Sequence, residues 1–186
     1  GLSILIGQRF GSGQTKHIPP ILSSFTIILG LVFTLLAALG ILLASPILRL
    51  LHTTSDTLRL AEDYLQIIFL GVPFLAVYNV YSAALRGIGD SRAPFLAVLV
   101  SSVVNVLLDL IFVAWFRWGV SGAAIATVIS QAAMTVFIIL YTIKKHSILR
   151  FRWKGKRIDR QALVQGMRFG FPPMIQSSVS AFGSLL

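Results

Sequence analysis

Four stretches of the sequence, at about 21–44, 60–85, 94–116 and 119–143, are apolar over a length that allows a helix to cross a membrane. A helix rises about 1.5 Å per residue, so about 20 apolar residues span the roughly 30 Å hydrocarbon core of a bilayer. The strands of a membrane barrel would be shorter and would alternate in polarity. The sequence therefore predicts an all-α fold, a polytopic transmembrane helical bundle.

The composition is that of an integral membrane protein. Of the 186 residues, 12% are charged and 56% are hydrophobic, and the mean hydropathy is +0.86. Soluble domains carry about 25% charged residues. Cysteine is absent, which excludes disulfide frameworks and thiolate metal sites.

The positive charge is concentrated in one segment. Half of the 16 Lys and Arg residues lie between Lys144 and Arg160. This clustering is a positive-inside signal rather than a nucleic-acid-binding surface. We expect a multi-pass protein of the plasma (inner) membrane, with 144–160 cytoplasmic, that contacts membrane lipid and no nucleic acid.

Alternation of the spans assigns the other loops to the two sides of the membrane. With 144–160 inside, 9–16 and 86–92 are also cytoplasmic, whereas 49–63 and Arg117 lie outside. The chain begins without Met, inside the end of an apolar helix at about 1–8, and it also ends in an apolar segment. We therefore expect it to be part of a longer protein.

One carboxylate lies deep inside an apolar stretch. The sequence has 6 acidic residues, and only Asp109 lies within an uninterrupted apolar run. An ionised carboxylate near the centre of a bilayer costs about 2.5–3.5 kcal/mol on insertion scales, so such residues usually face a wet cavity and mark an ion pathway. The alternative is that Asp109 only hydrogen-bonds to a neighbouring helix.

The third and fourth apolar stretches are joined by so few residues that they must form an antiparallel hairpin. Counting outward from a turn near Trp118 places Asp109 and Thr127 at the same depth, roughly 13 Å in from that end. Asn105 and Gln131 lie one turn deeper, and Asn105 shares a face with Asp109 because they are four residues apart. Such oxygen ligands suit a hard cation such as Na⁺, and a buried carboxyl also suits proton carriage.

Prolines and further polar side chains mark other candidates. Pro73 should bend the second stretch because it removes a backbone hydrogen bond, and Pro172 interrupts the last apolar segment, so both are candidate hinges. Asn79 and Tyr78 lie beyond the bend and, with Gln131, are candidates to line a cavity. Plain interhelical hydrogen bonding accounts for Asn79 and Tyr78 equally well.

Loop residues offer little further chemistry. Asp90 or Ser91 is placed to cap the helix that begins near Pro94. None of the 3 histidines has a second ligand-type residue at helical spacing, so we interpret them as loop or interfacial residues: His17, His52 and His146.

Several motifs together make the sequence resemble the multidrug and toxin extrusion (MATE) transporters. The resemblance covers almost the whole chain, and the order of its pieces is more specific than any one of them. The pieces are GQRFGSGQ, YLQIIFLGVPF, SAALRGIGDSRAPF, NVLLD, WGVSGAAIATVISQ and GFPP.

This resemblance implies twelve helices in two six-helix lobes. The chain would then hold one lobe plus part of the next: 1–143 in the N-terminal lobe, 144–163 as the basic inter-lobe linker, and 164–186 as the start of the C-terminal lobe. MATE proteins exchange cationic drugs and metabolites for Na⁺ or H⁺ by alternating access. The resemblance thus implies a monomeric antiporter for small organic cations that needs no cofactor beyond the coupling ion.

The family also implies a cation site. Its first-lobe site takes an Asn and an Asp four apart from the fifth helix and a Thr from the sixth, which match Asn105, Asp109 and Thr127. A further Asp of that site belongs to the family's first helix, which the chain does not include. The segment corresponding to helix seven carries no acidic residue, so coupling through that helix is not expected.

Other functions are less compatible with the sequence. A lipid-linked oligosaccharide flippase of the same superfamily would favour cationic residues inside the spans, and the four apolar stretches contain no Lys or Arg. A membrane enzyme would need a catalytic constellation, and the spans carry no HExxH pair or Ser-His-Asp set, and no twin carboxylates once the second span is counted from Tyr64. A channel stays open as a further alternative.

Overall fold

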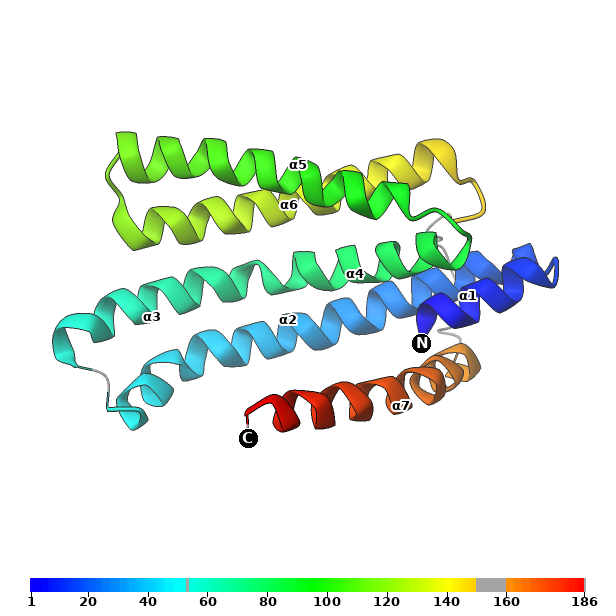
Figure 1. The fold of residues 1–186 in the computed structure, drawn as a ribbon, viewed down its shortest axis with the longest axis horizontal. Coiled ribbons are helices and arrows are strands. Elements are labelled where there is room, and N and C mark those ends of the chain that lie inside the picture. The colour runs from blue at the N-terminus through cyan, green and yellow to red at the C-terminus, as the bar shows by residue number, and fades with distance from the viewer. Residues whose placement is uncertain (53, 150–159, 186) are drawn as a thin grey trace.

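The computed structural model describes residues 1–52, 54–149 and 160–185, and its regular elements in these ranges are all helices (Figure 1). This confirms the all-α prediction. In chain order they are α1 Leu2–Gly11, the 3₁₀ turn η1 Thr15–His17, α2 Ile18–Leu50, α3 Ser55–Leu70, α4 Val72–Gly87, α5 Arg92–Asp109, the π-helical segment η2 Leu110–Trp115, α6 Gly119–Lys145 and α7 Arg160–Leu185.

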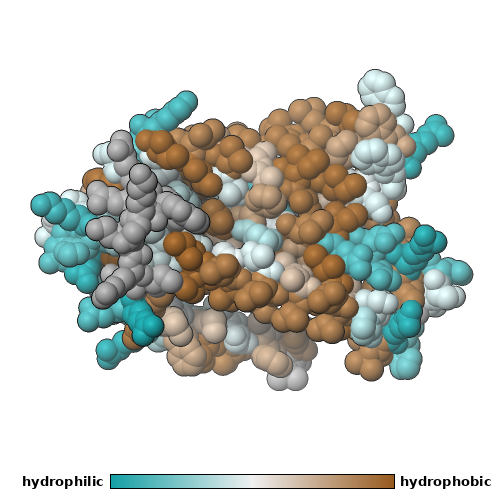
Figure 2. Space-filling view, turned by 180° about the vertical axis from the view of Figure 1, so that it is seen from behind, coloured by the Kyte–Doolittle hydropathy of each residue, from teal (hydrophilic) through white to brown (hydrophobic). Residues whose placement is uncertain are grey.

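Within the described residues, four helical segments are long and apolar enough to cross a membrane: Thr15–Leu50, Ser55–Gly87, Arg92–Trp115 and Gly119–Lys145. They coincide with the four apolar stretches of the sequence and extend several of their ends. The helices lie side by side along the long axis of the molecule (Figure 1). Apolar residues cover the middle of the molecule and polar residues gather at both ends, as expected for a protein whose middle part lies in lipid (Figure 2).

The connections between helices group at two ends of the molecule. The α1–α2 and α4–α5 connections, the end of α6 and the start of α7 lie at one end (Figure 1). The α2–α3 and α5–α6 connections lie at the other. This grouping is the one that alternation of the spans required, so we refer to the first end as cytoplasmic.

Prolines act differently in two of the helices. Gly71 separates α3 from α4, and Pro73 lies in the first turn of α4, where its missing N–H removes no helical hydrogen bond. The helix therefore breaks where the sequence predicted a bend. In contrast, α2 runs through Pro46 to Leu50, beyond the expected end of the first span. Transmembrane helices tolerate such prolines because local adjustments satisfy the freed carbonyl.

The core lies toward the cytoplasmic end. Leu5 of α1, Leu22 of α2, Leu85 of α4 and Ile138 of α6 are all buried in one cluster. Because α6 takes part in this cluster, it fixes the α5–α6 hairpin relative to α1, α2 and α4.

The last helix contacts the others only near its start. A Cβ atom added at Gly166 of α7 would lie 2.2 Å from Cζ of Phe25, so the glycine lets the ring pack against the helix backbone. From there α7 continues as one helix through Pro172, and its residues 171–185 are exposed. No break therefore occurs at Pro172 in this structure.

Candidate functional site

The α5–α6 hairpin closes through a tight turn. Arg117 and Gly119 have positive φ values of 57° and 66°, and the Trp118 N–H donates to the carbonyl oxygen of Phe112 at 2.9 Å. Gly122 is buried, and a Cβ atom there would lie 3.1 Å from the same oxygen. The absence of a side chain at 122 therefore lets the start of α6 touch the end of η2.

Deeper in the hairpin, Asn105 of α5 contacts α6. Its Nδ2 donates to Ser130 Oγ at 3.2 Å, and Ser130 Oγ donates to the carbonyl oxygen of Thr127 at 2.7 Å. The Asn105–Ser130 contact lies on one side of Asp109 and Thr127 along the hairpin, and the contact of α6 with η2 at the turn lies on the other side. The two residues therefore lie at about the same depth, which is the arrangement that the turn-centred count predicts.

Two predicted site residues each donate a hydrogen bond to a residue other than Asp109. Thr127 Oγ1 donates to the carbonyl oxygen of Ala123 at 3.0 Å, and the Nδ2 of Asn105 donates to Ser130. A hydroxyl oxygen keeps two lone pairs after donating, and an amide keeps its carbonyl oxygen. Thr127 therefore offers lone pairs and no donor, whereas Asn105 keeps its carbonyl oxygen and one amide N–H.

Two side-chain oxygens are buried without a partner in the described part of the chain, Asp109 Oδ1 and Gln131 Oε1. Leaving a buried acceptor unpaired costs about 1–3 kcal/mol, and more for a charged group. Both atoms are acceptors when the carboxyl is ionised, so what would satisfy them is a cation, a proton or a water molecule.

Asp109 also lies where its helix changes hydrogen-bonding pattern. It is the last residue of α5 and directly precedes the π-helical segment η2. At the end of η2, the Phe116 N–H donates to the carbonyl oxygen of Ile111, five residues earlier, at 2.8 Å. Segments of π-helix are rare and are frequent at functional sites.

Gln131 reaches from α6 to the break between α3 and α4. A Cβ atom at Gly71 would lie 2.1 Å from Gln131 Oε1. One turn further along α6, Thr135 Oγ1 lies 2.9 Å from the carbonyl oxygen of Phe74 and 2.9 Å from that of Gln131. The break that precedes Pro73 is therefore held by the helix that also carries Thr127 and Ser130.

The two other cavity candidates lie outside this cluster. Tyr78 is buried, and its hydroxyl donates to the carbonyl oxygen of Pro94 at 3.3 Å, so it joins α4 to the start of α5. Asn79, the next residue on α4, is exposed. The structure thus brings Asn105, Asp109, Thr127 and Gln131 into one hairpin and leaves Tyr78 and Asn79 apart from it.

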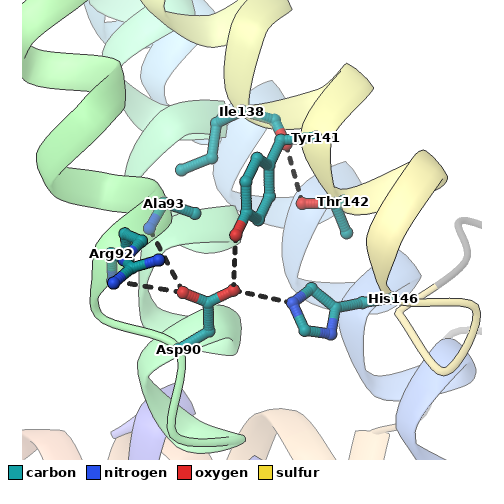
Figure 3. Close-up of polar contacts among 7 residues, drawn as sticks. All are labelled: Asp90, Arg92, Ala93, Ile138, Tyr141, Thr142 and His146. Carbon is teal, nitrogen blue, oxygen red and sulfur yellow. Dashed lines mark hydrogen bonds and ion pairs between the residues drawn. The ribbon is translucent and has the colours of Figure 1, made fainter.

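A second polar cluster lies at the cytoplasmic end (Figure 3). Asp90 Oδ1 accepts hydrogen bonds from the backbone N–H groups of Arg92 and Ala93, at 3.1 and 3.2 Å. Its Oδ2 accepts from the Tyr141 hydroxyl at 3.1 Å and lies 2.7 Å from His146 Nε2. The carboxylate therefore caps α5 and ties the α4–α5 connection to the end of α6.

The sequence identified this cluster only in part. Asp90 was one of two candidate caps, and Ser91 makes no side-chain capping bond. His146 gave no local signal, because its partner is 56 positions away. Burial acts to raise the pKa of Asp90, but the hydrogen bonds from His146, Ala93 and Tyr141 outweigh it and lower this pKa below its usual range.

The described residues contain no group of three or more His, Cys, Asp or Glu side chains that could hold a metal ion. The hairpin instead carries one carboxylate, Asp109, and the neutral side chains of Asn105, Thr127 and Gln131. The four helical segments that are long and apolar enough to cross a membrane define a polytopic membrane protein, and one of them carries the buried, unpaired Oδ1 of Asp109.

Comparison with known proteins identifies the family. The family model described as MatE matches residues 1–111, so the chain belongs to the MatE family of transporters, which are not enzymes. It is 35% identical over 185 residues to the probable multidrug resistance protein YoeA of Bacillus subtilis, covering 94% of this chain and 39% of the relative. It is 30% identical over 184 residues to the multidrug export protein MepA of Staphylococcus saprophyticus, covering 92% and 41%.

Solved structures show the same fold. A MATE structure in the bent conformation superposes with a TM-score of 0.88 at 24% identity, covering 98% of this chain and 42% of that one. An inward-facing multidrug resistance MATE family transporter of the MOP superfamily gives a TM-score of 0.85, covering 92% and 39%. The chain spans about two fifths of the length of these relatives, and it belongs to a multi-pass cell-membrane protein.

Proposed function

We propose that the protein containing this chain is a secondary active antiporter that exports organic cations in exchange for Na⁺ or H⁺, and that Asp109 binds the coupling ion. The observation that carries this proposal is the buried Asp109 Oδ1, which has no partner in the described residues. The cargo class rests on the relatives, which are named as multidrug resistance and export proteins. Those relatives give no support to the flippase alternative.

The surrounding hydrogen bonds favour ion binding over a structural role for Asp109. Asn105 donates one amide hydrogen to Ser130 and Thr127 donates its hydroxyl hydrogen to Ala123, so the oxygens of both side chains remain as candidate ligands. A cation bound at this level would meet one charged and two neutral oxygens, the ligand type that hard cations prefer. Its binding would also remove the cost of a lone buried carboxylate.

Coupling requires that the bound and empty states favour different conformations. Asp109 directly precedes η2, so ion binding would neutralise the residue at which the helix changes from α-helical to π-helical hydrogen bonding. In addition, Gln131 connects the same hairpin to the break at Gly71. Both contacts give ion binding a route to alter helix packing.

The two coupling ions make different demands on the site. Na⁺ would use Asp109 together with the oxygens of Asn105 and Thr127, whereas H⁺ needs only the carboxylate. N105A and T127A should therefore abolish Na⁺-driven efflux and leave H⁺-driven efflux largely intact. Equal sensitivity of both modes would show that these residues serve the fold rather than the ion.

The central test uses the full-length protein in proteoliposomes. Efflux of a cationic dye is measured under an imposed pH gradient or an imposed Na⁺ gradient. D109N should abolish gradient-driven efflux, while D63N, which removes an exposed carboxylate on α3, should retain it. Gradient-driven efflux at the parent rate in D109N contradicts the proposal, and flux that needs no counter-gradient would instead indicate a channel.

A further inference from the structure

A pocket of about 420 Å³ lies at the cytoplasmic end between α1 and α7. Its lining residues come from both helices and are Gln8, Arg9, Ser12, Gln165, Arg168 and Phe169. Among the described residues, no carboxylate lies within salt-bridge distance of either guanidinium. Two cations thus share one pocket, and the described residues provide no counter-charge within that distance.

Local contacts fix the α1 side of this pocket. Arg9 Nη1 donates to Gln14 Oε1 at 2.5 Å, and Ser12 Oγ donates to the Arg9 carbonyl oxygen at 3.2 Å. The remaining N–H groups of Arg9 stay available for a ligand, because a guanidinium carries five donors in a planar fork.

The α7 side is held by close helix packing. Gly166, which contacts the ring of Phe25, precedes Arg168 by two residues. Gly1 packs against Gly166 and Gly170, since a Cβ atom on Gly1 would lie 2.0 Å from the Gly166 carbonyl oxygen. The backbone of α7 therefore lies close to Gly1, the residue that directly precedes α1.

We propose that this pocket binds the phosphate group of an anionic ligand through Arg9 and Arg168. Guanidinium forks match phosphate oxygens in bidentate pairs, and basic pockets between membrane helices on the cytoplasmic side take anionic headgroups. Two guanidinium groups would repel the organic cations that the transporter exports, so this site is separate from the cargo path. It is also separate from Asp109, which lies in the α5–α6 hairpin.

Such a ligand would join two parts of the transporter. The resemblance to MATE proteins assigns α1 and α7 to different lobes, and the phosphate would bridge one arginine from each. Because alternating access moves the lobes relative to each other, a bridging ligand would favour the conformation in which these helix ends touch.

The test uses native mass spectrometry of the full-length protein with added phosphatidylglycerol or phosphatidylcholine. The parent should retain phosphatidylglycerol and not phosphatidylcholine. R9Q/R168Q should weaken that retention about tenfold or more, because it removes both basic contacts to the phosphate group. The charge-matched control is K16Q/K144Q, which removes two exposed cations at the same end, outside the pocket.

Parent-level retention in R9Q/R168Q, or an equal loss in K16Q/K144Q, overturns the proposal. A competition experiment with inorganic phosphate shows which part of the lipid the site recognises. If phosphate displaces the lipid, the site recognises the phosphate group alone. If the lipid is retained at saturating phosphate, the site recognises the headgroup together with its glycerol. If R9Q/R168Q does not elute as a single species, R9K/R168K replaces it. That variant keeps both charges but loses the forks, and parent-level retention there also overturns the proposal.

Discussion

Gln131 Oε1 occupies the space beside Gly71 where any other residue would carry its Cβ atom, which would lie 2.1 Å away. This contact joins the helix that carries Thr127 to the break between α3 and α4. The same oxygen is one of two that are buried without a partner in the described residues. The pair therefore connects the candidate cation site to the place where the second span breaks.

The Gly71–Gln131 contact predicts an effect of opposite sign in two backgrounds. G71A alone should destabilise the protein by less than the about 1–3 kcal/mol typical of overpacking, because the new methyl group meets the flexible end of the Gln131 side chain. In a Q131A background the clash is absent, and φ at Gly71 is −82°, which alanine adopts freely. There G71A should be neutral or stabilising by up to about 1 kcal/mol. Thermal unfolding of the four proteins in detergent checks this, and equal effects in both backgrounds would contradict the contact.

The Asn105–Ser130 hydrogen bond predicts a measurable coupling. N105A and S130A should each destabilise the protein, and their double-mutant cycle should give an interaction energy of about 0.5–1.5 kcal/mol. The control cycle pairs N105A with T34A, an exposed residue of α2 that bonds only to its own helix, and should be additive. An interaction energy of zero for Asn105 and Ser130 would show that their hydrogen bond contributes nothing to the stability of the hairpin.

The depth of the candidate site along the hairpin could be predicted from the sequence, because it depends only on the position of the turn and the rise per residue of the helix. A short turn fixes the antiparallel pairing of α5 with α6, and a constant rise per residue then fixes which positions are level. Asp109 and Thr127 follow from that count. The rotation of each helix about its axis does not follow, because it depends on packing against the other helices. The count paired Asn105 with Gln131, whereas its contact is Ser130, the neighbouring position turned by about 100°.

Contacts between segments that are distant in the sequence could not be predicted, because they also depend on how the helices pack. Asp90 and His146 are joined only because α6 returns to the end where α5 begins, and no local spacing indicates this pairing. The proximity of Gln131 to Gly71 likewise depends on how α6 packs against the α3–α4 break. Pro73 gave a local signal because proline is disfavoured inside a helix, and the break lies next to it. The same signal did not mark a break at Pro46 or Pro172, which lie inside continuous helices.

The close approach at Gly122 predicts a strong preference for glycine. A Cβ atom there would lie 2.9 Å from Trp118 Cβ and 3.1 Å from the Phe112 carbonyl oxygen, atoms that cannot move without shifting the turn. G122A should therefore cost about 1–3 kcal/mol. The matched control is G183A on α7, where nothing lies within 4 Å and alanine should be neutral or stabilising by about 0.5–1 kcal/mol. Equal unfolding temperatures for the two variants would contradict this prediction.

Asp90 predicts a stability contribution that depends on pH. Its hydrogen bonds lower the pKa of the carboxyl in the folded protein relative to the unfolded value of about 3.9. A lowered folded-state pKa means that the contribution is fully present above the unfolded pKa and is lost as pH falls through the folded pKa. D90N should thus destabilise the protein by about 1–2 kcal/mol at pH 5.5, in line with the loss of charge-assisted hydrogen bonds. The difference between parent and variant should shrink below pH about 4.

Unfolding temperatures of the parent and D90N between about pH 3 and 5.5 measure this dependence. D63N serves as the control because it removes an exposed carboxylate from α3 at the other end of the molecule. H146A should cost less than D90N, since Asp90 would keep the Tyr141 hydroxyl and two backbone N–H donors. A constant gap between parent and D90N down to pH about 3 would show that the charge on Asp90 does not stabilise the α4–α5 connection, and that its role is limited to capping α5.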